Sequence, residues 1–174
     1  MANEAILGSY TPEEVTVVIS VGGQVHNVTG YAEGTFITAT RNIPPAEAFQ
    51  GSDNQGGRVK RRNTSRRVTL SLMQFTASNN FMEAWQAADE EASRNEFIGS
   101  VMIKDNSGTT LLHSNQAFIE VSPDIVFSNT AEQRDWTIFL FNATGKIGGN
   151  TLIDESTAAA IEGLGGQVDA RWRL

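Results

Sequence analysis

Residues 68–75 read Val-Thr-Leu-Ser-Leu-Met-Gln-Phe, an alternation of apolar and polar side chains. In an extended chain the valine and leucines fall on one side, and the threonine and serine fall on the other. This pattern predicts an antiparallel strand with one buried face. Similar stretches rich in β-branched residues, bounded by Gly, Pro and Asn, predict further strands over 15–21, 24–29, 35–41, 97–104, 109–121, 125–127 and 134–143.

A helical stripe follows this strand, with apolar side chains at Phe81, Met82, Trp85, Ala88 and Ala92. We expect Ser78 or Asn79 to cap the helix and residues 94–95 to end it. A weaker helical pattern covers 155–162. The predicted fold class is therefore mainly β, an antiparallel β-sandwich or barrel with one flanking α-helix and a long projecting loop or hairpin.

The predicted organisation has three parts. Residues 1–13 form an N-terminal arm, residues 14–150 form the β domain, and residues 151–174 form a C-terminal extension. Residues 42–67 contain few apolar side chains and a glycine-rich run at 51–57. Because a long structureless loop is uncommon inside a compact domain, we expect this segment to project as a hairpin or arm with its tip near 51–57.

Charge is distributed unevenly along the chain, which carries a net charge of −7. Six basic residues with no acid between them lie at Arg58, Lys60, Arg61, Arg62, Arg66 and Arg67. The rest of the chain holds 7 basic and 20 acidic residues, a balance of −13. The cluster is a phosphate-binding arm, a solvated hairpin, or a basic arm that docks on an acidic surface of an identical neighbour. No aromatic residue lies within the cluster, which disfavours base stacking. We favour the third interpretation, because it accounts for both the basic cluster and the acidic balance of the rest of the chain.

The sequence offers little for catalysis. It has no cysteine, which excludes disulfides and thiolate chemistry, and its two histidines, His26 and His113, lie in separate predicted strands. No catalytic or metal-binding motif occurs. We expect no enzymatic activity, catalytic residue, cofactor or metal site. We also expect no signal peptide, because no basic segment followed by an apolar run stands at the start of the sequence. We expect no membrane partner, because no apolar run approaches the roughly 20 residues of a membrane helix.

An ordered set of short segments resembles one known family. The segments are 8–15, 34–37, 41–42, 78–80, 104–110, 123–127, 134–137 and 148–150. In their order and spacing the chain resembles the tail tube proteins of contractile-tail bacteriophages, the myoviruses. That resemblance implies a β-sandwich with one flanking helix, in a structural protein rather than an enzyme.

The resemblance also implies a role and partners. Such proteins form hexameric rings that stack into a hollow tube in the virion tail, after synthesis in the host cytoplasm. The implied partners are further copies of the chain, the tail sheath protein, and the baseplate and tail terminator proteins. DNA passes through the lumen during ejection without specific binding. The loop at 42–67 is expected to reach a neighbouring subunit, through the six basic residues named above.

Two alternatives remain open. One is a nucleic-acid-binding β module that uses the basic cluster at 58–67. The other is the tube protein of a related secretion or bacteriocin-like injection machine. Residues 151–174 extend beyond the part that resembles the family. We predict that Arg171, Trp172 and Arg173 anchor this extension to the outer surface of the tube or to an adjacent ring.

Overall fold

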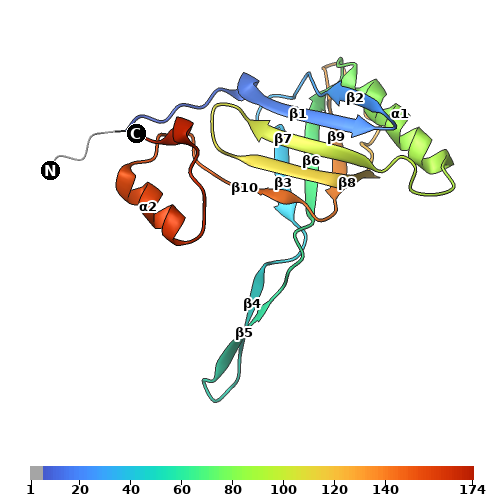
Figure 1. The fold of residues 1–174 in the computed structure, drawn as a ribbon. Helices are drawn as coiled ribbons and strands as arrows, with labels where there is room; N and C mark the ends of the chain where they lie inside the picture. Colours follow the sequence, from blue (N-terminus) through green and yellow to red (C-terminus); the bar gives the residue numbers. More distant parts are fainter. Residues whose placement is uncertain (1–5) are drawn as a thin grey trace.

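Ten strands and two α-helices are present in residues 6–174, which a computed structural model describes (Figure 1). The strands are β1 (Val15–Val21), β2 (Gln24–Asn27), β3 (Ile37–Arg41), β4 (Ala46–Gln50), β5 (Gly56–Lys60), β6 (Arg66–Met73), β7 (Gly99–Asp105), β8 (Leu111–Val121), β9 (Gln133–Leu140) and β10 (Thr144–Lys146). The helices are α1 (Ser78–Glu91) and α2 (Glu155–Gly163), and short 3-10 turns cover Pro12–Glu14 and Ala170–Trp172.

Eight of these strands form one antiparallel sheet in the order β2-β1-β7-β8-β9-β6-β3, with β10 also paired to β8. β8 joins the two halves, because Ala117 pairs with Gly99 of β7 and with Leu140 of β9. Figure 1 shows the β1–β7–β8 half running across the β9–β6–β3 half. Register shifts in β8 after Ile119 and in β7 after Gly99 accompany this bend, as bulges do in strongly twisted sheets.

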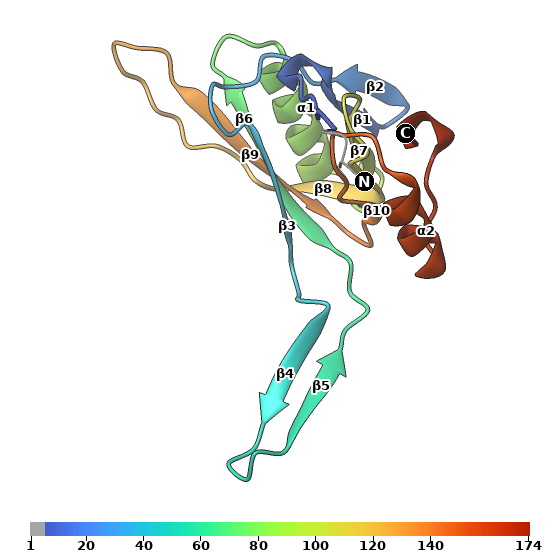
Figure 2. The same ribbon diagram turned by 90° about the vertical axis from the view of Figure 1, so that its left-hand side faces the viewer.

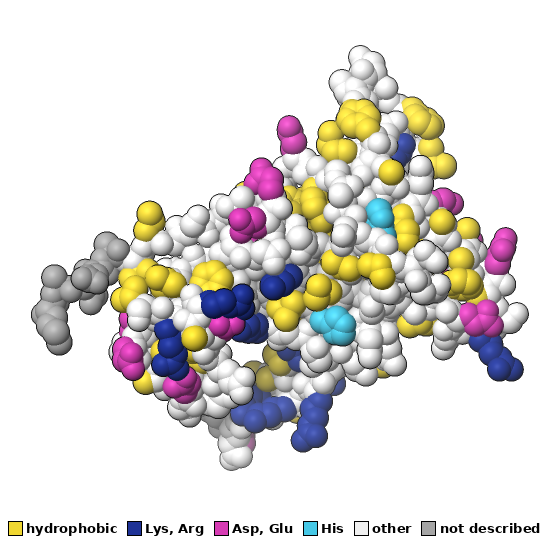
Figure 3. Space-filling model, turned by 45° about the horizontal axis from the view of Figure 1, so that its top comes forward, with side chains coloured by type: hydrophobic (Ala, Val, Ile, Leu, Met, Phe, Trp, Pro, Cys, Tyr) yellow, Lys and Arg dark blue, Asp and Glu magenta, His cyan; other side chains and the backbone are white. Residues whose placement is uncertain are grey.

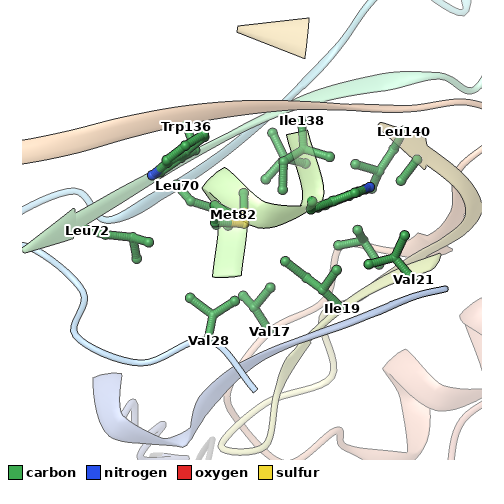
Figure 4. Packing of buried hydrophobic residues seen from close by; sticks show 14 of the residues in the cluster. Val17, Ile19, Val21, Val28, Leu70, Leu72, Met82, Trp136, Ile138 and Leu140 are labelled. Atoms are coloured by element: carbon green, nitrogen blue, oxygen red, sulfur yellow. The ribbon is translucent and has the colours of Figure 1, made fainter. Parts of the chain in front are cut away.

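The core lies between the two halves of the sheet and α1 (Figure 4). Val68, Leu70 and Leu72 of β6 are fully buried, which confirms the face predicted from their alternation. Met82 and Trp85 of α1 close the core from the side. Burying each such side chain contributes about 1.5–3 kcal/mol. The predicted mainly β fold with a flanking helix is confirmed.

The predicted cap of α1 is wrong. The helix begins at Ser78, and the buried Ser78 hydroxyl contacts His26 Nε2 at 2.8 Å and accepts a hydrogen bond from Thr29 N–H at 3.0 Å. Thr76 Oγ1 instead accepts a hydrogen bond from Ser78 N–H. The local pattern indicated the start of the helix correctly, but tertiary contacts of Ser78 removed its hydroxyl from capping. The helix also ends at Glu91, before the predicted 94–95.

One strand prediction is wrong, and one strand of the structure was not predicted. Residues 125–127 form no strand and lie in the long loop between β8 and β9, where Ile125 and Phe127 are exposed. β10 was not predicted, because Thr-Gly-Lys is too short to show alternation. It forms because the chain turns after β9 and continues along β8, pairing Gly145 with Leu112.

The C-terminal extension contains α2, which confirms the weaker helical pattern at 155–162. Its two ends meet, because Ile153 and Arg173 form a parallel bridge and Ile153 N–H donates to the Trp172 carbonyl at 2.7 Å. Asp154 caps α2 by accepting from Thr157 N–H at 3.0 Å. Of the predicted N-terminal arm, residues 1–5 lie outside the described residues. Ser9 N–H donates to the Asn150 carbonyl at 3.0 Å, which fastens the rest of that arm to the start of the extension.

Candidate subunit interface

The hairpin formed by β4 and β5, here called the arm, projects from the body of the protein (Figures 1 and 2). Every residue of both strands is exposed. A turn at the tip is closed by Gly51 N–H, which donates to the Gln55 carbonyl at 2.7 Å. The predicted projecting hairpin with its tip near 51–57 is therefore confirmed.

The arm has two chemically different faces. Arg58 and Lys60 lie on one face with two alanines of β4, since cross-strand partners share a face. Phe49 and Val59 lie on the other face together with Glu47, and their exposed fractions are 52% and 46%. An isolated two-stranded hairpin is marginally stable in water. The arm therefore presents apolar surface that its own chain leaves exposed.

This apolar face was not predicted from the sequence. Residues 42–67 contain few apolar side chains, and Phe49 and Val59 come to lie on one side only when β4 and β5 pair. The alternation of small and large side chains across Ala46–Gln50 was the available signal. It was weak because the strand is only five residues long.

The six predicted interface cations do not form one cluster. Arg58 and Lys60 share an arm face, and Arg61 pairs with Glu47 at 3.0 Å. Arg62 is exposed in the segment that returns to the body. Arg66 and Arg67 belong to β6, so the predicted limit of the arm at residue 67 is wrong. The reason is that β6 pairs with both β3 and β9 from Arg66 onward, which places the last two cations in the sheet.

The Arg67 side chain forms hydrogen bonds and an ion pair with residues of its own chain. Its guanidinium donates to both carboxylate oxygens of Glu120, at 2.7 and 2.9 Å, and also contacts Asn42. The hydrogen bond to Glu120 raises the pKa of Arg67. The guanidinium also lies over the Phe139 ring, 5.4 Å from its centroid. Arg67 is therefore held by contacts within its own subunit, and its predicted contact with a neighbouring subunit stays a prediction.

Arg66 lines a cleft of about 460 Å³ between β3, β7 and β10, here called the cationic cleft. Arg41 and Lys146 line the same cleft. Arg41 donates to the Asn63 carbonyl through Nε and Nη2, at 3.2 and 2.8 Å, at the root of the arm. The cleft walls thus carry three cations on an otherwise largely apolar lining.

Three strands lie at edges of the sheet, and on their outer sides no strand within residues 6–174 pairs with their backbone groups. β3 pairs on one side with β6, β10 pairs with β8, and β2 pairs with β1, and the sheet path ends at β2 and β3. Thr38, Ala39 and Thr40 of β3 are exposed. Free strand edges are templates for pairing with another chain. They are a second route to contact between subunits.

Arg171, Trp172 and Arg173 lie together in the extension, apart from the arm (Figure 1). Arg171 pairs with Asp169 at 2.7 Å, and this hydrogen bond lowers the Asp169 pKa to about 2. Arg173 pairs with Glu162, and Trp172 is half-buried. Figure 3 shows basic and acidic side chains intermingled over this part of the molecule. Both guanidinium groups are engaged inside the extension, and contact with another subunit stays a prediction.

The described residues offer no assembled metal site, since no group of three or more His, Asp or Glu side chains in 6–174 is arranged to hold an ion. His26 stacks on Phe81 with ring centroids 4.4 Å apart, and burial lowers its pKa. Its position against Ser78 makes it a packing residue. Neither α1 nor α2 is long and apolar enough to cross a membrane, and no other helix of the described chain is either.

Comparison with known proteins shows to which family the chain belongs. No family model matches it. It is 36% identical over 166 residues to Structural protein ORF10 of Pseudomonas phage KPP10, across 94% of this chain and 96% of that protein. The protein belongs to this family of phage structural proteins.

Solved structures similar to this phage structural protein come from contractile injection systems. The tube-terminating cap of the anti-feeding prophage matches with a TM-score of 0.50 and 15% identity, over 83% of this chain and 95% of the cap. A sheath–tube complex of the extracellular contractile injection system PVC matches with a TM-score of 0.44 and 14% identity, over 75% of this chain and 87% of that one. At such identities the first likeness shows a shared fold.

Proposed function

We propose that this phage structural protein is the tube subunit of a contractile tail. In this proposal it forms hexameric rings that stack into a hollow tube, and DNA passes through the lumen on ejection. The sheath surrounds the tube, and the baseplate and a terminator protein contact its ends. The role is structural, and we assign no catalytic activity, in keeping with the structural name of its relative.

The arm is the observation that carries this proposal. It extends from the body with all residues of β4 and β5 exposed, including Phe49 and Val59. Ordering such a segment costs conformational entropy that its own chain does not offset. Contacts with a second subunit would offset that cost. A contact between an arm and a different surface of an identical copy is heterologous, and such contacts generate rings or open stacks.

The free edges of β3 and β10 support ring formation. Strand pairing between neighbouring copies would satisfy edge groups that otherwise invite uncontrolled association. A closed inter-subunit sheet has no edge left to pair. The acidic balance of the chain outside the cluster at 58–67 suits a lumen through which DNA slides, because like charges disfavour adhesion.

The same fold occurs in a tube-terminating cap, so a ring that ends a tube is the second candidate function. A related injection machine rather than a phage tail is a variant of either candidate. The nucleic-acid-binding alternative is less well supported. Arg67 and Arg61 are paired with carboxylates and Arg66 faces the cationic cleft, so the cations do not line one phosphate-binding surface.

Negative-stain electron microscopy of the purified chain at high concentration tests the proposal. Hollow rods with six-fold symmetry are expected for a tube subunit, and single rings that never stack would indicate a cap. Featureless monomers under all salt and temperature conditions, even after addition of tail baseplates as nuclei, would count against both. DNA affinity that falls steeply with rising salt would instead favour the nucleic-acid-binding alternative.

The predicted anchoring role of the extension is tested separately. A chain ending at residue 150 lacks Arg171, Trp172 and Arg173 together with α2. If these residues hold the extension to the tube surface or to an adjacent ring, rods of the shortened chain will be fewer and shorter at equal protein concentration. Unchanged rods would show that the extension has no part in assembly.

A further inference from the structure

The arm requires a particular kind of partner surface. It is a thin ribbon with Phe49 and Val59 on one face and Arg58 and Lys60 on the other. A flat surface could cover one face only. A groove that receives the ribbon edge-on, with an apolar wall on one side and an acidic wall on the other, would cover both faces at once.

The body carries a groove with this division. Its volume is about 750 Å³, and it lies between the C-terminal end of α1 and the corner where β9 leaves β8. Phe118 and Phe141 line it from β8 and the end of β9, and Asp89 and Asn95 line it from α1 and the loop that follows. The lining is completed by Ile98, Asn115 and Gln116. Phe141 is 45% exposed although it is a large aromatic residue. We call this cleft the α1 groove.

Further acidic residues lie close to Asp89 in the sequence. Glu90 and Glu91 follow Asp89 on α1, Glu96 lies in the next loop, and Arg94 is the one cation of this stretch. Within residues 6–174 no ion pair neutralises Asp89, Glu91 or Glu96. Figure 3 shows acidic side chains gathered at the right-hand end of the molecule, where α1 ends. The end of α1 therefore carries uncompensated negative charge beside the groove.

Two other clefts fit the arm less well. The cationic cleft would place Arg41, Arg66 and Lys146 against the cations of the arm. A second acidic cleft, lined by Glu83 and Asp124, has a mostly polar lining, and Arg134 occupies it by donating to the Asp124 carbonyl at 3.1 Å. The first has no acidic side chain on its lining, and the second has Arg134 on its lining.

We propose that the arm of one copy enters the α1 groove of a second copy. Phe49 and Val59 pack on Phe118 and Phe141, while Arg58 and Lys60 face the acidic end of α1. The arm reaches about 30 Å beyond the end of β3 at roughly 3.3 Å per residue, so the groove that it fills belongs to another molecule. This inference rests on the proposed function and names the two surfaces that join successive subunits.

Site-directed crosslinking of the full chain tests the contact. The chain has no cysteine, so each introduced thiol is unique. Gly57→Cys protein, which keeps Phe49 and places its thiol opposite it on the same arm face, is mixed with Gln116→Cys protein. The second thiol lies at the exposed rim of the α1 groove, and the mixture is oxidised. Two control mixtures pair Gly57→Cys with Asn80→Cys in the second acidic cleft, or with Thr144→Cys in the cationic cleft. We expect at least tenfold more disulfide-linked heterodimer in the groove mixture than in either control, read on a non-reducing gel.

A charge exchange isolates the electrostatic part of the contact. Arg58→Glu with Lys60→Glu reverses the charge of the arm, and Glu90→Lys with Glu91→Lys reverses the charge at the end of α1 beside the groove. Each reversal tested against an unreversed partner is expected to reduce crosslinking about tenfold. The reversed arm mixed with the reversed groove is expected to recover it. Because all four positions are exposed, unfolding curves of the variants should match the parent.

The outcomes separate this inference from the proposed function. If the native chain forms rods but the control mixtures crosslink as well as the groove mixture, the α1 groove is not the arm's site and the tube function stands. Failure of the charge exchange to restore crosslinking also overturns the inference. If no mixture crosslinks and the native chain forms no ring or rod on tail baseplates, both ideas fail together.

Discussion

Removing the arm should leave the fold stable while abolishing assembly. Asn42 N–H donates to the Ser65 carbonyl at 2.9 Å, which is the geometry at the end of an antiparallel hairpin. Replacing residues 43–64 by Asn-Gly would join β3 to β6 through a two-residue turn of the type that such hairpins favour. The variant therefore keeps the sheet and loses only the projecting segment.

The expected stability change is small because two effects oppose each other. The connection becomes roughly tenfold shorter, which is between three and four successive halvings of its length. Each halving lowers the entropic cost of loop closure by about 0.6 kcal/mol, so the folded state gains about 2 kcal/mol. The two hydrogen bonds from Arg41 to the Asn63 carbonyl are lost, which costs about 1–2 kcal/mol for a half-buried cation. Loss of the bond from Ser65 N–H to Asn63 Oδ1 adds about 0.5–1 kcal/mol. The free energy of unfolding should stay within about 1 kcal/mol of the parent.

Urea unfolding followed by fluorescence of the buried Trp85 and Trp136 measures this change. The m-value should also be nearly unchanged, because the arm buries little surface in the monomer. Asn54→Gly at the arm tip is the matched control, since it keeps the arm and suits the positive φ there. A loss above about 3 kcal/mol, or rods formed by the armless chain, would refute the reasoning.

Three further substitutions test other parts of the structure. Gly145→Ala would place Cβ 2.0 Å from the Leu111 carbonyl oxygen at a φ of +149°, so we expect a loss of about 2–3 kcal/mol in urea unfolding. His26→Gln should weaken the dependence of the unfolding free energy on pH. Burial lowers the pKa of His26 in the folded protein below 6.5, so the parent loses stability as the pH falls below 6.5. Unfolding of both proteins at about pH 7.5 and about pH 5 measures the difference. Asp154→Ala removes the cap that accepts from Thr157 N–H and should lower hydrogen-exchange protection across α2.

Each of these has a direct control. Gly149→Ala meets no atom within 4 Å and should unfold like the parent. An equal pH slope in the His26→Gln protein would show that the histidine does not set the pH dependence. The α2 cap should also weaken in the parent at low pH. Hydrogen bonds from Ser156 and Thr157 lower the pKa of Asp154 below its ordinary value of 3.8. The cap therefore stabilises the folded state at pH values above 3.8, and this stabilisation is lost as the pH falls from 3.8 toward the lowered pKa.

Local periodicity in the sequence determined the main elements. Alternation fixed the buried face of β6, helical spacing placed α1 over Met82 and Trp85, and the glycine-rich run marked the arm tip. These features follow from short-range sterics and from burial of one face, so a single stretch of sequence contains them. The same local reasoning failed at 125–127, where β-branched residues lie in an exposed loop because no neighbouring strand is available to pair with them.

Tertiary structure alone decided which residues share a surface. The cations at 58–67 are contiguous in sequence, yet strand pairing places Arg58 on the arm and commits Arg67 to Glu120, which lies 53 residues further along the chain. The apolar face of Phe49 and Val59 exists only when β4 and β5 are in register, and the α1 groove joins a helix end to a strand corner. Such surfaces depend on the relative placement of distant segments, and no local pattern encodes that placement.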